Sequence, residues 1–357
     1  MKLYDLLEIS DLGEAIVNKQ VKENRHPIYK NLSIYEYTNE TMYDRMWNDV
    51  TQKCRGLIVD TDSLDVLARP FDKFFNYNEP NAPVLPLDMP AIVTDKLDGS
   101  MGILYRRPDG FWEVSTKGSF QSEQGAHATM LMHQKYGWFL NDLDHEFTYM
   151  FEIIYPQNRI VLDYGDRDEL VLIGARHMES GAVYYPNELP EWKWGRAEMF
   201  PYKTLREALE APPRPNAEGY VIHFPATEEM VKVKQDDYLK LHKIVTGLTK
   251  KRIWENLSSG VTHRELAMII PEEWHDWLEV QIKELQAEFR LIDYTAKADY
   301  RQLVKQLDKD SPGWDRKEFA SCATHRDWTV YPDLLFLQLD GKNIAPSVWK
   351  RIMPKGD

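Results

Sequence analysis

A change in the pattern of apolar residues near residue 240 limits the folds open to this chain. Before it lie short β-like runs, among them Leu57–Asp60, Phe147–Ile154, Glu169–Arg176, Gly219–Phe224 and Met230–Lys234. After residue 240, apolar residues recur at the spacing that is typical of helices, and few segments have the pattern of a strand. Strands followed by helices are typical of α+β proteins or of separate domains. We predict an α+β chain with mainly antiparallel sheets over residues 1–243, followed by an all-α domain over residues 244–357.

Apolar spacing also predicts individual helices. An amphipathic segment opens the chain, and Glu123–Tyr136 is a helix expected among the strands. The expected C-terminal helices are Leu239–Leu257, Thr262–Ile269, Glu272–Leu307, Arg316–Ala323 and Pro346–Ile352. Asn78–Pro90 carries four prolines and is expected to be a loop.

The composition narrows the class of protein. With 357 residues, 43% hydrophobic and 12% aromatic, the chain is long enough for two domains with substantial cores. We expect no membrane span, because no apolar run reaches about 18 residues. The N-terminal segment lacks the apolar stretch of a signal peptide, and two cysteines, Cys54 and Cys322, cannot make a disulfide framework. These features favour a cytoplasmic protein.

The formal charge of −13 argues against a passive nucleic-acid coat, which is usually basic. The excess of acid lies almost wholly before residue 240. An enzyme that acts on polyphosphate must therefore gather positive charge locally. Lys232 and Lys234 fit this need, because alternation along a strand puts both amines on one face. The alternative is a solvated edge strand whose lysines prevent aggregation.

The sequence KLDGS at residues 96–100 lies between two apolar runs, Ala91–Thr94 and Met101–Tyr105. This pattern predicts a strand, a tight turn and a second strand, with Gly99 permitting the turn. Lys96 would then be fixed by a sheet and still open to a ligand. Lysine is a nucleophile only as the free amine, a form that burial, nearby cations or a metal ion can favour. The alternative is a surface lysine beside an ordinary Asp-Gly turn.

Several other charged residues have two interpretations. Glu152, in FEIIYP, is either an inward-facing functional group or the polar side of a half-buried strand. Glu218 directly precedes a predicted strand and would lie near Lys232 and Lys234 in a hairpin. Arg55 and Lys73 are either surface cations or phosphate ligands, since arginine suits bidentate contact with phosphate and lysine acts as a point charge.

The order K-x-D-G-S, F-E-I-I-Y-P, E-G-Y-V and K-V-K resembles that of the covalent nucleotidyltransferases, which include ATP-dependent ligases and RNA-capping guanylyltransferases. The chain is most similar to the RNA ligase 1 family of T-even phages. The likeness spans roughly residues 30–245. The segments that further support it are Arg55-Gly56, Arg69-Pro70, Lys73–Asn76, Ser115–Ser119, Asn158–Val161 and Lys232–Lys234.

The resemblance implies an antiparallel-sheet nucleotidyltransferase domain, related to ATP-grasp ligases, before the helical domain. It further implies an ATP-dependent RNA ligase. Lys96 would attack the α-phosphate of ATP, release pyrophosphate and become lysyl-AMP. AMP would pass to an RNA 5′-phosphate, and a 3′-hydroxyl would then displace it to form the phosphodiester bond.

The resemblance also implies roles for individual residues. The catalytic group would be Lys96, Glu152, Glu218, Lys232 and Lys234. ATP and its phosphates would be bound by Arg55, Lys73, Lys96, Lys117, Glu152, Gly219, Lys232, Lys234 and Tyr238. Glu218 and Glu152 would bind Mg²⁺, or Mn²⁺ in its place, since Mg²⁺ is commonly held by one or two carboxylates plus phosphate. One and two metal ions both remain open.

Some residues depart from the wider superfamily. Ser100 and Met101 follow the glycine where DNA ligases and capping enzymes carry an arginine close by. His177 is a candidate to stack on the purine, with a structural histidine as the alternative. A capping guanylyltransferase is the second enzymatic hypothesis, and an RNA-binding module that has lost catalysis is the third.

The helical domain has no readable motif, but the family associates such a domain with the choice of RNA substrate. Lys250-Lys251-Arg252 would either touch an RNA backbone or form a solvated helix face. We expect the partners to be single-stranded RNA or cleaved tRNA ends, with an end-healing kinase/phosphatase acting beforehand. We expect a monomer without membrane contact, in the host cytoplasm if a phage encodes it.

Overall fold

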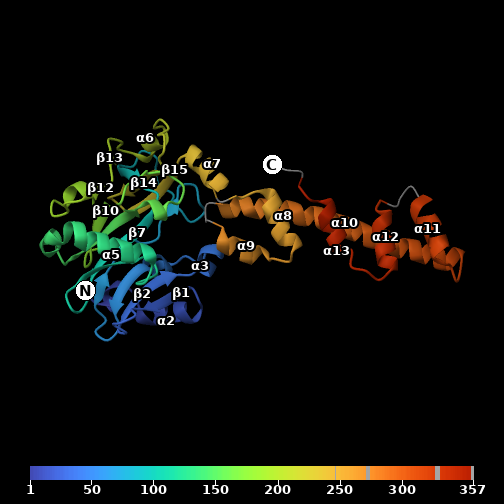
Figure 1. Cartoon of the computed structure of the whole chain (residues 1–357), viewed down its shortest axis with the longest axis horizontal. Coiled ribbons are helices and arrows are strands. Elements are labelled where there is room, and N and C mark those ends of the chain that lie inside the picture. Colours follow the sequence, from blue (N-terminus) through green and yellow to red (C-terminus); the bar gives the residue numbers. More distant parts are fainter. Residues whose placement is uncertain (246, 271–273, 326–329, 355–357) are drawn as a thin grey trace. The chain divides into compact units, whose positions relative to one another are not determined.

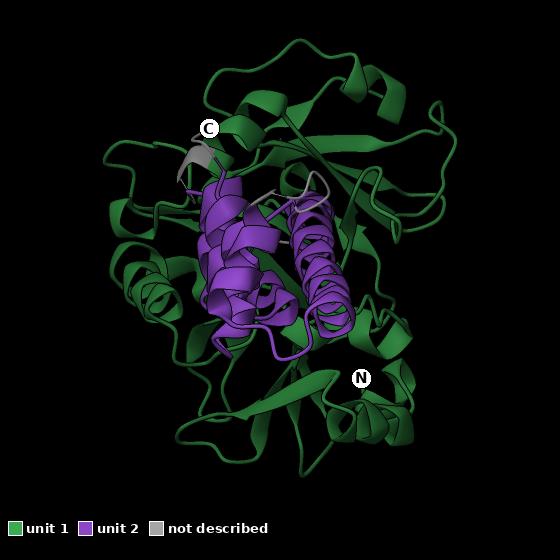
Figure 2. Ribbon diagram, turned by 90° about the vertical axis from the view of Figure 1, so that its right-hand side faces the viewer, with its two compact units in different colours: residues 1–246 green, residues 247–357 purple. Residues whose placement is uncertain are grey.

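The computed structural model describes residues 1–245, 247–270, 274–325 and 330–354 (Figure 1). The chain divides into two compact units, Met1–Thr246 and Gly247–Asp357 (Figure 2). This division falls three residues after the predicted boundary between residues 243 and 244. Unit 1 contains all the described strands, and the described part of unit 2 is helical. The molecule is therefore an α+β protein with a helical C-terminal region.

The first sheet of unit 1 is antiparallel and has the strand order β1-β2-β3-β4. Its strands are β1 (Val21–Arg25), β2 (Leu32–Tyr37), β3 (Arg55–Asp60) and β4 (Val66–Ala68). The helices around it are α1 (Leu3–Leu6), α2 (Ile9–Val17), α3 (Asn39–Tyr43) and α4 (Asp49–Lys53). Leucines of α1 and α2 pack against buried Leu57 and Val59 of β3. This packing holds the start of β3, where Arg55 lies.

The second sheet has the order β11-β10-β9-β7-β8, with β12 paired in parallel to β10. Its strands are β7 (Ser100–Arg106), β8 (Trp112–Thr116), β9 (Phe147–Ile154), β10 (Glu169–His177), β11 (Val183–Tyr184) and β12 (Gly195–Arg196). The helical segments beside it are α5 (Glu123–Tyr136), η1 (Gly137–Asp142), η2 (Pro156–Asn158) and η3 (Pro186–Glu188). The predicted helix over residues 123–136 is confirmed. Its apolar side joins the largest buried core of the unit.

The third sheet has the order β13-β6-β14-β15-β5. Its strands are β5 (Phe75–Asn76), β6 (Ile92–Lys96), β13 (Met199–Phe200), β14 (Gly219–Phe224) and β15 (Glu229–Lys234). Helix α6 (Leu205–Leu209) packs on one face, against buried Tyr220, Ile222 and Phe224. The opposite face therefore carries the alternate residues of the same strands. The predicted hairpin of β14 and β15 is confirmed.

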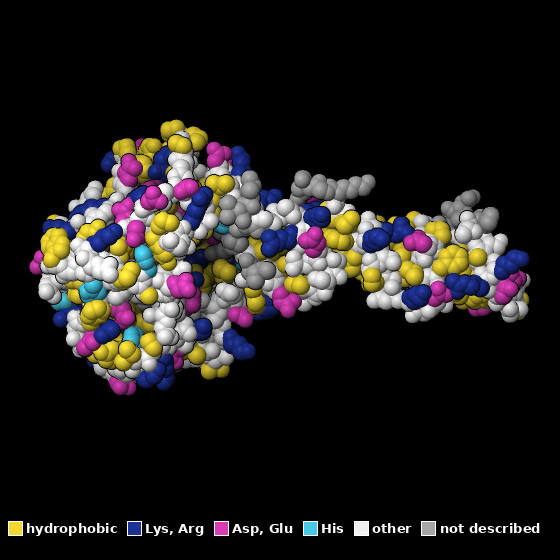
Figure 3. Space-filling view, viewed as in Figure 1, with side chains coloured by type: hydrophobic (Ala, Val, Ile, Leu, Met, Phe, Trp, Pro, Cys, Tyr) yellow, Lys and Arg dark blue, Asp and Glu magenta, His cyan; other side chains and the backbone are white. Residues whose placement is uncertain are grey.

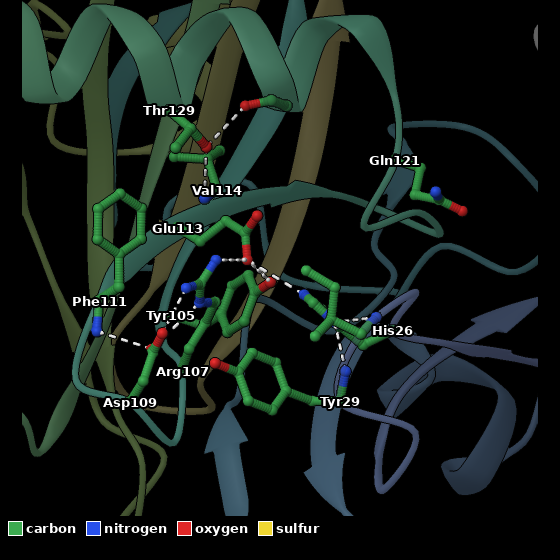
Figure 4. A network of polar contacts seen from close by, with 12 residues as sticks. His26, Tyr29, Tyr105, Arg107, Asp109, Phe111, Glu113, Val114, Gln121 and Thr129 are labelled. Carbon is green, nitrogen blue, oxygen red and sulfur yellow. Dashed lines mark hydrogen bonds and ion pairs between the residues drawn. The ribbon is translucent and has the colours of Figure 1, made fainter.

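A buried polar network joins the first sheet to the β7–β8 hairpin (Figure 4). The Glu113 carboxylate accepts a hydrogen bond from the Tyr105 hydroxyl at 2.5 Å and lies 3.2 Å from His26 Nε2. His26 Nδ1 accepts the amide hydrogens of Ile28 and Tyr29 at 3.1 and 3.0 Å. The ring proton must therefore lie on Nε2 and point to Glu113. The network fixes the hairpin next to β1 and β2.

Unit 2 is built around the long helix α10 (His275–Asp310). Its other helices are α8 (Lys250–Ser258), α9 (His263–Ile269), α11 (Arg316–His325), α12 (Pro332–Leu339) and α13 (Ala345–Arg351). Two buried clusters line α10, one around Leu303 and Phe319 and one around Ala296 and Val348. On the surface of this unit, hydrophobic, basic and acidic side chains are interspersed (Figure 3). No helix in the described part of the chain is long and apolar enough to cross a membrane.

One helix prediction differs from the structure, and the start of another cannot be compared with it. The single helix expected over Leu239–Leu257 is two helices, α7 (Asp236–Val245) and α8. Gly247 has a φ of +60°, and the Thr249 side chain caps α8 by accepting the Arg252 amide hydrogen. Apolar spacing alone does not detect such a break, because it continues on both sides. The start expected for α10 at Glu272 lies outside the described residues.

Candidate active site

Lys96 is the last residue of β6, and β7 begins at Ser100. The predicted strand, turn and strand around it are confirmed. The Lys96 Nζ lies 2.8 Å from Oε1 of Glu218, and 19% of its side chain is exposed. Lys96 pairs across the sheet with Gly219, so the backbone itself places Glu218 beside the amine. The lysine is thus fixed by the sheet and remains accessible, as the sequence predicted.

The Glu218 side chain is more buried than that of Lys96, with only 3% of it exposed. Its Oε1 also lies 3.2 Å from Nζ of Lys234 on β15. One carboxylate therefore holds two lysine side chains whose positions in the chain are 138 residues apart. Such a buried, shared carboxylate requires both cations, since a lone buried charge is costly.

Gly219 makes this arrangement possible. Its φ is +156°, and a Cβ at this position would lie 1.9 Å from the Val233 carbonyl oxygen. The resemblance to the ligase family implies that Gly219 lies beside the nucleotide. In the structure, the tight contact that demands glycine is with β15, where Gly219 pairs with Lys234.

Glu152 lies on β9, opposite Met101 of β7, and lines the same cavity as Lys96. Burial raises the pKa of Glu152 to about 8; Lys96 opposes this shift, and Glu218 adds to it. A Cβ on Gly99 would lie 2.7 Å from the Ile153 carbonyl oxygen, so only glycine lets the turn approach β9 this closely. Lys96, Glu152, Glu218 and Lys234 are therefore gathered in one place.

Asp98 fixes the turn that follows Lys96 through hydrogen bonds of its side chain and of its backbone amide. Its buried carboxylate accepts the amide hydrogens of Val161 and Leu162 at 2.8 and 2.7 Å, and the Tyr238 hydroxyl at 2.9 Å. Its own amide donates to the Tyr164 hydroxyl at 2.9 Å. The sequence analysis assigned no role to Asp98. Its position in the K-x-D-G motif could have indicated a role. The residues that it contacts, however, lie more than 60 positions away in the sequence, and the motif gives no information about them.

Tyr238 was predicted to border the phosphates. It is buried, its hydroxyl donates to Asp98, and the Lys234 Nζ lies 5.3 Å from its ring centre. The structure thus places it against both the lysine turn and one of the cations. Its contact with phosphate stays a prediction.

The remaining predicted cations come from several parts of unit 1: Arg55 is on β3 and Lys232 on β15, whereas Lys73 precedes β5 and Lys117 follows β8. Arg55 lines the cavity of Lys96, and its guanidinium donates to the Phe71 carbonyl at 3.2 Å. Burial lowers the pKa of Arg55, and Tyr37, Glu152 and Asp72 oppose that shift. Lys232 lines the same cavity, with its Nζ 5.5 Å from the ring centre of Phe74.

Lys73 and Lys117 lie against aromatic rings that the sequence analysis missed. The Lys73 Nζ lies 5.8, 5.1 and 5.0 Å from the ring centres of Tyr37, Trp47 and Phe75, and only 5% of the residue is exposed. The Lys117 Nζ lies 4.4 Å from the Tyr37 ring and 3.1 Å from Glu36. Because Lys73 is buried, its cation–π contacts are desolvated and stabilise the ammonium by about 2 kcal/mol, whereas the more exposed Lys117 gains less. No sequence pattern marks Trp47, because it lies between helices α3 and α4 and meets Lys73 only in the fold.

The cavity beside Lys96 measures about 130 Å³. Its lining residues are Arg55, Phe71, Phe74, Ile92, Thr94, Asp95, Lys96, Leu97, Met101, Glu152, Ile173, Val183, Tyr185, Val221, His223, Met230 and Lys232. His177, the candidate for stacking on a purine, is not among them. Its ring contacts Phe147 and its Nδ1 lies 3.0 Å from the Ser180 hydroxyl, so that prediction is wrong. The cavity instead offers aliphatic and aromatic side chains next to a cluster of charges.

Within the described residues, no group of three His, Cys, Asp or Glu side chains is placed to hold a metal ion. The two carboxylates of the site are Glu152 and Glu218. Their surroundings suit a hard divalent cation that takes its remaining ligands from phosphate and water. The site therefore combines a positioned amine with several cations and two carboxylates. Lys96, Arg55, Lys232 and Glu152 line the cavity. Glu218 and Lys234 are joined to Lys96 by ion pairs, and Lys73 and Lys117 are not among the lining residues.

Comparison with known proteins finds relatives that are named as RNA ligases. A protein described as a bifunctional polynucleotide kinase/RNA ligase of Autographa californica nuclear polyhedrosis virus is 28% identical over 219 residues; the match covers 54% of this chain and 31% of that protein. An RNA ligase of Rhodothermus phage RM378 is 25% identical over 380 aligned positions, with 84% of this chain and 82% of that protein covered.

Solved structures resemble the chain more distantly. A variant of the Naegleria gruberi RNA ligase with ATP and Mn matches with a TM-score of 0.35 and 18% identity, over 44% of this chain and 52% of that one. This likeness is too weak to support an argument about the site. By contrast, the sequence profile of the RNA ligase family matches residues 53–240, from the helix before Arg55 to the helix that carries Tyr238. Since this match covers more than half of the chain and every predicted site residue, the chain belongs to the RNA ligase family of the phage T4 RNA ligase 1 type.

Proposed function

We propose that this chain is an ATP-dependent RNA ligase that joins 5′-phosphate and 3′-hydroxyl ends through a lysyl-AMP on Lys96. The observation that carries the proposal is the pair of contacts at Glu218, which brings the Nζ atoms of Lys96 and Lys234 to one carboxylate. Family membership supplies the reaction class. The proposal includes the finer fold assignment, an ATP-grasp-like nucleotidyltransferase domain over residues 1–243.

The first step needs Lys96 as a free amine. The Glu218 carboxylate, 2.8 Å away, is in place to accept the ammonium proton. The Nζ lone pair then attacks the α-phosphorus of ATP, a P–N bond forms, and the bond to the bridging oxygen breaks as pyrophosphate leaves. Lys232 and Lys234 neutralise the charge that spreads over the phosphate oxygens, which is the protein's main contribution to phosphoryl transfer. Arg55, on the same cavity, adds a further cation.

In the later steps, AMP passes from Lys96 to the RNA 5′-phosphate. The 3′-hydroxyl of the second end attacks that phosphate, and AMP leaves with its electron pair. The same cations serve each step, because all three reactions place a phosphate in the cavity. We assign Lys73, Lys117, Gly219 and Tyr238 to the surroundings of the nucleotide phosphates.

The residues present fit a divalent cation at Glu218 and Glu152. Because burial raises the pKa of Glu152 to about 8, a cation nearby would favour its charged form at neutral pH. Bound Mg²⁺, or Mn²⁺, would neutralise phosphate charge; one or two ions fit this sparse set of ligands.

The RNA partners are proposals as well. We assign single-stranded RNA or cleaved tRNA ends as substrates and the helical region, residues 244–357, to their selection. A kinase/phosphatase would prepare the ends, a pairing supported by the viral relative whose name combines kinase and ligase. We propose a monomer that works in the cytoplasm.

Incubation with ATP or GTP labelled at the α-phosphate, with Mg²⁺, tests the first step. A covalent adduct is expected with ATP, and Lys96→Ala is expected to abolish it. Lys22→Ala is the matched control, since Lys22 is an exposed lysine of β1. Labelling by GTP alone would instead identify a capping guanylyltransferase. Sealing assays on linear RNA, nicked duplex and a cleaved anticodon stem-loop would then define the substrate.

A further inference from the structure

The face of the third sheet that lines the cavity changes in character along its strands. Cross-strand pairing places its residues in three rows. The rows are Lys96–Gly219–Lys234, Thr94–Val221–Lys232 and Ile92–His223–Met230. The first row is the candidate phosphate site. The third row lies four residues further along β14, about 13 Å away at the usual rise per residue. A nucleoside monophosphate held at Lys96 spans this distance.

The far end of the cavity holds a pair of polar side chains between aliphatic ones. His223 and Tyr185 both line the cavity, together with Ile173, Val183 and Val221. His223 is 3% exposed, and its Nδ1 lies 2.5 Å from the Tyr185 hydroxyl oxygen. Burial lowers the pKa of His223, so the imidazole is neutral at pH 7. Aliphatic walls with a polar end suit a flat heterocycle that is recognised at its edge.

The position of the single imidazole hydrogen decides what this end can recognise. His223 Nε2 lies 3.4 Å from Oε2 of Glu228, which attracts the hydrogen to Nε2. Nδ1 is then an acceptor and takes the hydroxyl hydrogen of Tyr185. Burial raises the pKa of Tyr185, so this hydroxyl stays protonated. With its hydrogen committed to His223, the Tyr185 oxygen can only accept a hydrogen bond from a ligand.

We propose that the Tyr185 hydroxyl, held as an acceptor by His223, recognises the exocyclic amino group of adenine. An acceptor at this point favours a 6-amino purine and disfavours a 6-oxo purine, whose oxygen would face it without a hydrogen between them. This inference rests on the proposed function and adds to it the basis of base selection. Tyr185 is thus a specificity residue, and His223 is a positioning residue.

The test compares three nucleotides labelled at the α-phosphate: ATP, purine riboside triphosphate, which has no 6-substituent, and ITP, which has a 6-oxo group. For the wild type, kcat/KM of adduct formation is expected to be about tenfold higher with ATP than with purine riboside triphosphate, the worth of one hydrogen bond. It is expected to be lowest with ITP. In Tyr185→Phe, the ATP value is expected to fall to that of purine riboside triphosphate, which stays unchanged.

His223→Phe provides a second variant. Without the imidazole acceptor, the Tyr185 hydroxyl is free to donate its hydrogen to a 6-oxo group. The ratio of ITP to ATP labelling is therefore expected to rise by about tenfold. A merely structural role for either residue would lower labelling from all three nucleotides by the same factor, and that result would overturn the proposal. So would a wild type that labels equally with ATP and purine riboside triphosphate, a result that needs no variant to fold.

Calorimetry separates this inference from the proposed function. Binding of AMP, purine riboside monophosphate and IMP to wild type and Tyr185→Phe needs no covalent step. Preference for AMP that disappears in Tyr185→Phe, in a protein that takes no label, would refute the ligase mechanism and support the base recognition. Labelling with ATP, together with equal affinity for AMP and purine riboside monophosphate, would do the reverse.

Discussion

The ion pairs around Lys96 in unit 1 and the ion pairs within helix α10 of unit 2 differ in how far apart their members lie in the sequence. In unit 1, Glu218 pairs with Lys96, and Arg214 pairs with Asp95 at 2.7 Å, across more than 115 residues in each case. On α10 of unit 2, Lys297 pairs with Asp293 and Lys283 with Glu279, one helical turn apart. Pairs of the second kind form in any exposed helix and are worth about 0.3–0.5 kcal/mol. Pairs of the first kind exist only in the folded unit, and the candidate chemistry depends on them.

The largest effect on adduct formation is expected for a substitution of Glu218, whose carboxylate pairs with two lysines from distant parts of the chain. Glu218→Gln is expected to reduce adduct formation by at least about 100-fold, because it removes the partner of Lys96 and a candidate metal ligand. Asp293→Asn removes a carboxylate from a local pair on α10 and should leave labelling unchanged. Equal labelling of the two variants would show that buried and local pairs do not differ in function.

A second comparison is between two lysines of the candidate site and an exposed lysine of helix α10. Lys234→Ala and Lys232→Ala are each expected to lower the rate of adduct formation by about 10- to 100-fold, since each removes a cation from the phosphate site. Lys234 should have the larger effect, because it also contacts Glu218. Lys297→Ala on α10 is the control. Single-turnover labelling measures all three, and normal labelling of Lys232→Ala and Lys234→Ala would contradict their assigned roles.

Asp98 is a buried carboxylate that we expect to stabilise the fold of unit 1, whereas we expect Glu218 to take part in the reaction. Asp98→Ala leaves two amide hydrogens and the Tyr238 hydroxyl without their acceptor, at a cost of about 2–4 kcal/mol. Tyr238→Phe removes only one of these bonds and should cost about 1 kcal/mol. Urea unfolding followed by tryptophan fluorescence measures both. Equal stability of Asp98→Ala and wild type would show that the turn is held by other contacts.

The last expected effect is a dependence of the folding stability on pH. The pKa of Glu152 is about 8 in the folded protein and about 4.5 when unfolded, so between these values the folded state binds the extra proton. Stability from this group is complete below pH 4.5 and is lost as pH rises toward 8. Without divalent ions, Glu152→Gln should remove this loss, because the amide has no proton to release in this pH range. Thermal unfolding at pH 5 and pH 9 measures it, and parallel curves for wild type and variant would refute the assignment.

The local features of the site were predictable from the sequence. Period-two alternation identified β14 and β15 and put Lys232 and Lys234 on one face. The apolar runs around residues 96–100 identified the strand, turn and strand. The helix over residues 123–136 was predicted with both ends correct, and in the structure the Ser122 side chain caps it by accepting the Gly125 amide hydrogen. Each of these signals lies within about a dozen residues.

Features that depend on contacts between distant segments were missed or misread. Tyr37 and Trp47 surround Lys73, yet nothing near them in the sequence indicates a lysine. His177 was a candidate to stack on a purine, but it is the last residue of β10 and its ring contacts Phe147. The partners of Asp98 and the pairing of Tyr185 with His223 likewise arise from segments brought together by packing.

The sequence by itself determined the α+β order, the nucleophile candidate and the family, because these depend on local periodicity and on short motifs in a fixed order. Only the tertiary structure decided which charges share a partner. A buried carboxylate such as Glu218 is stable only when cations from other strands neutralise it, and which cations reach it depends on the pairing of β6, β14 and β15. Strand pairing brings together residues that are more than a hundred positions apart in the sequence, and local sequence patterns carry no information about such pairings.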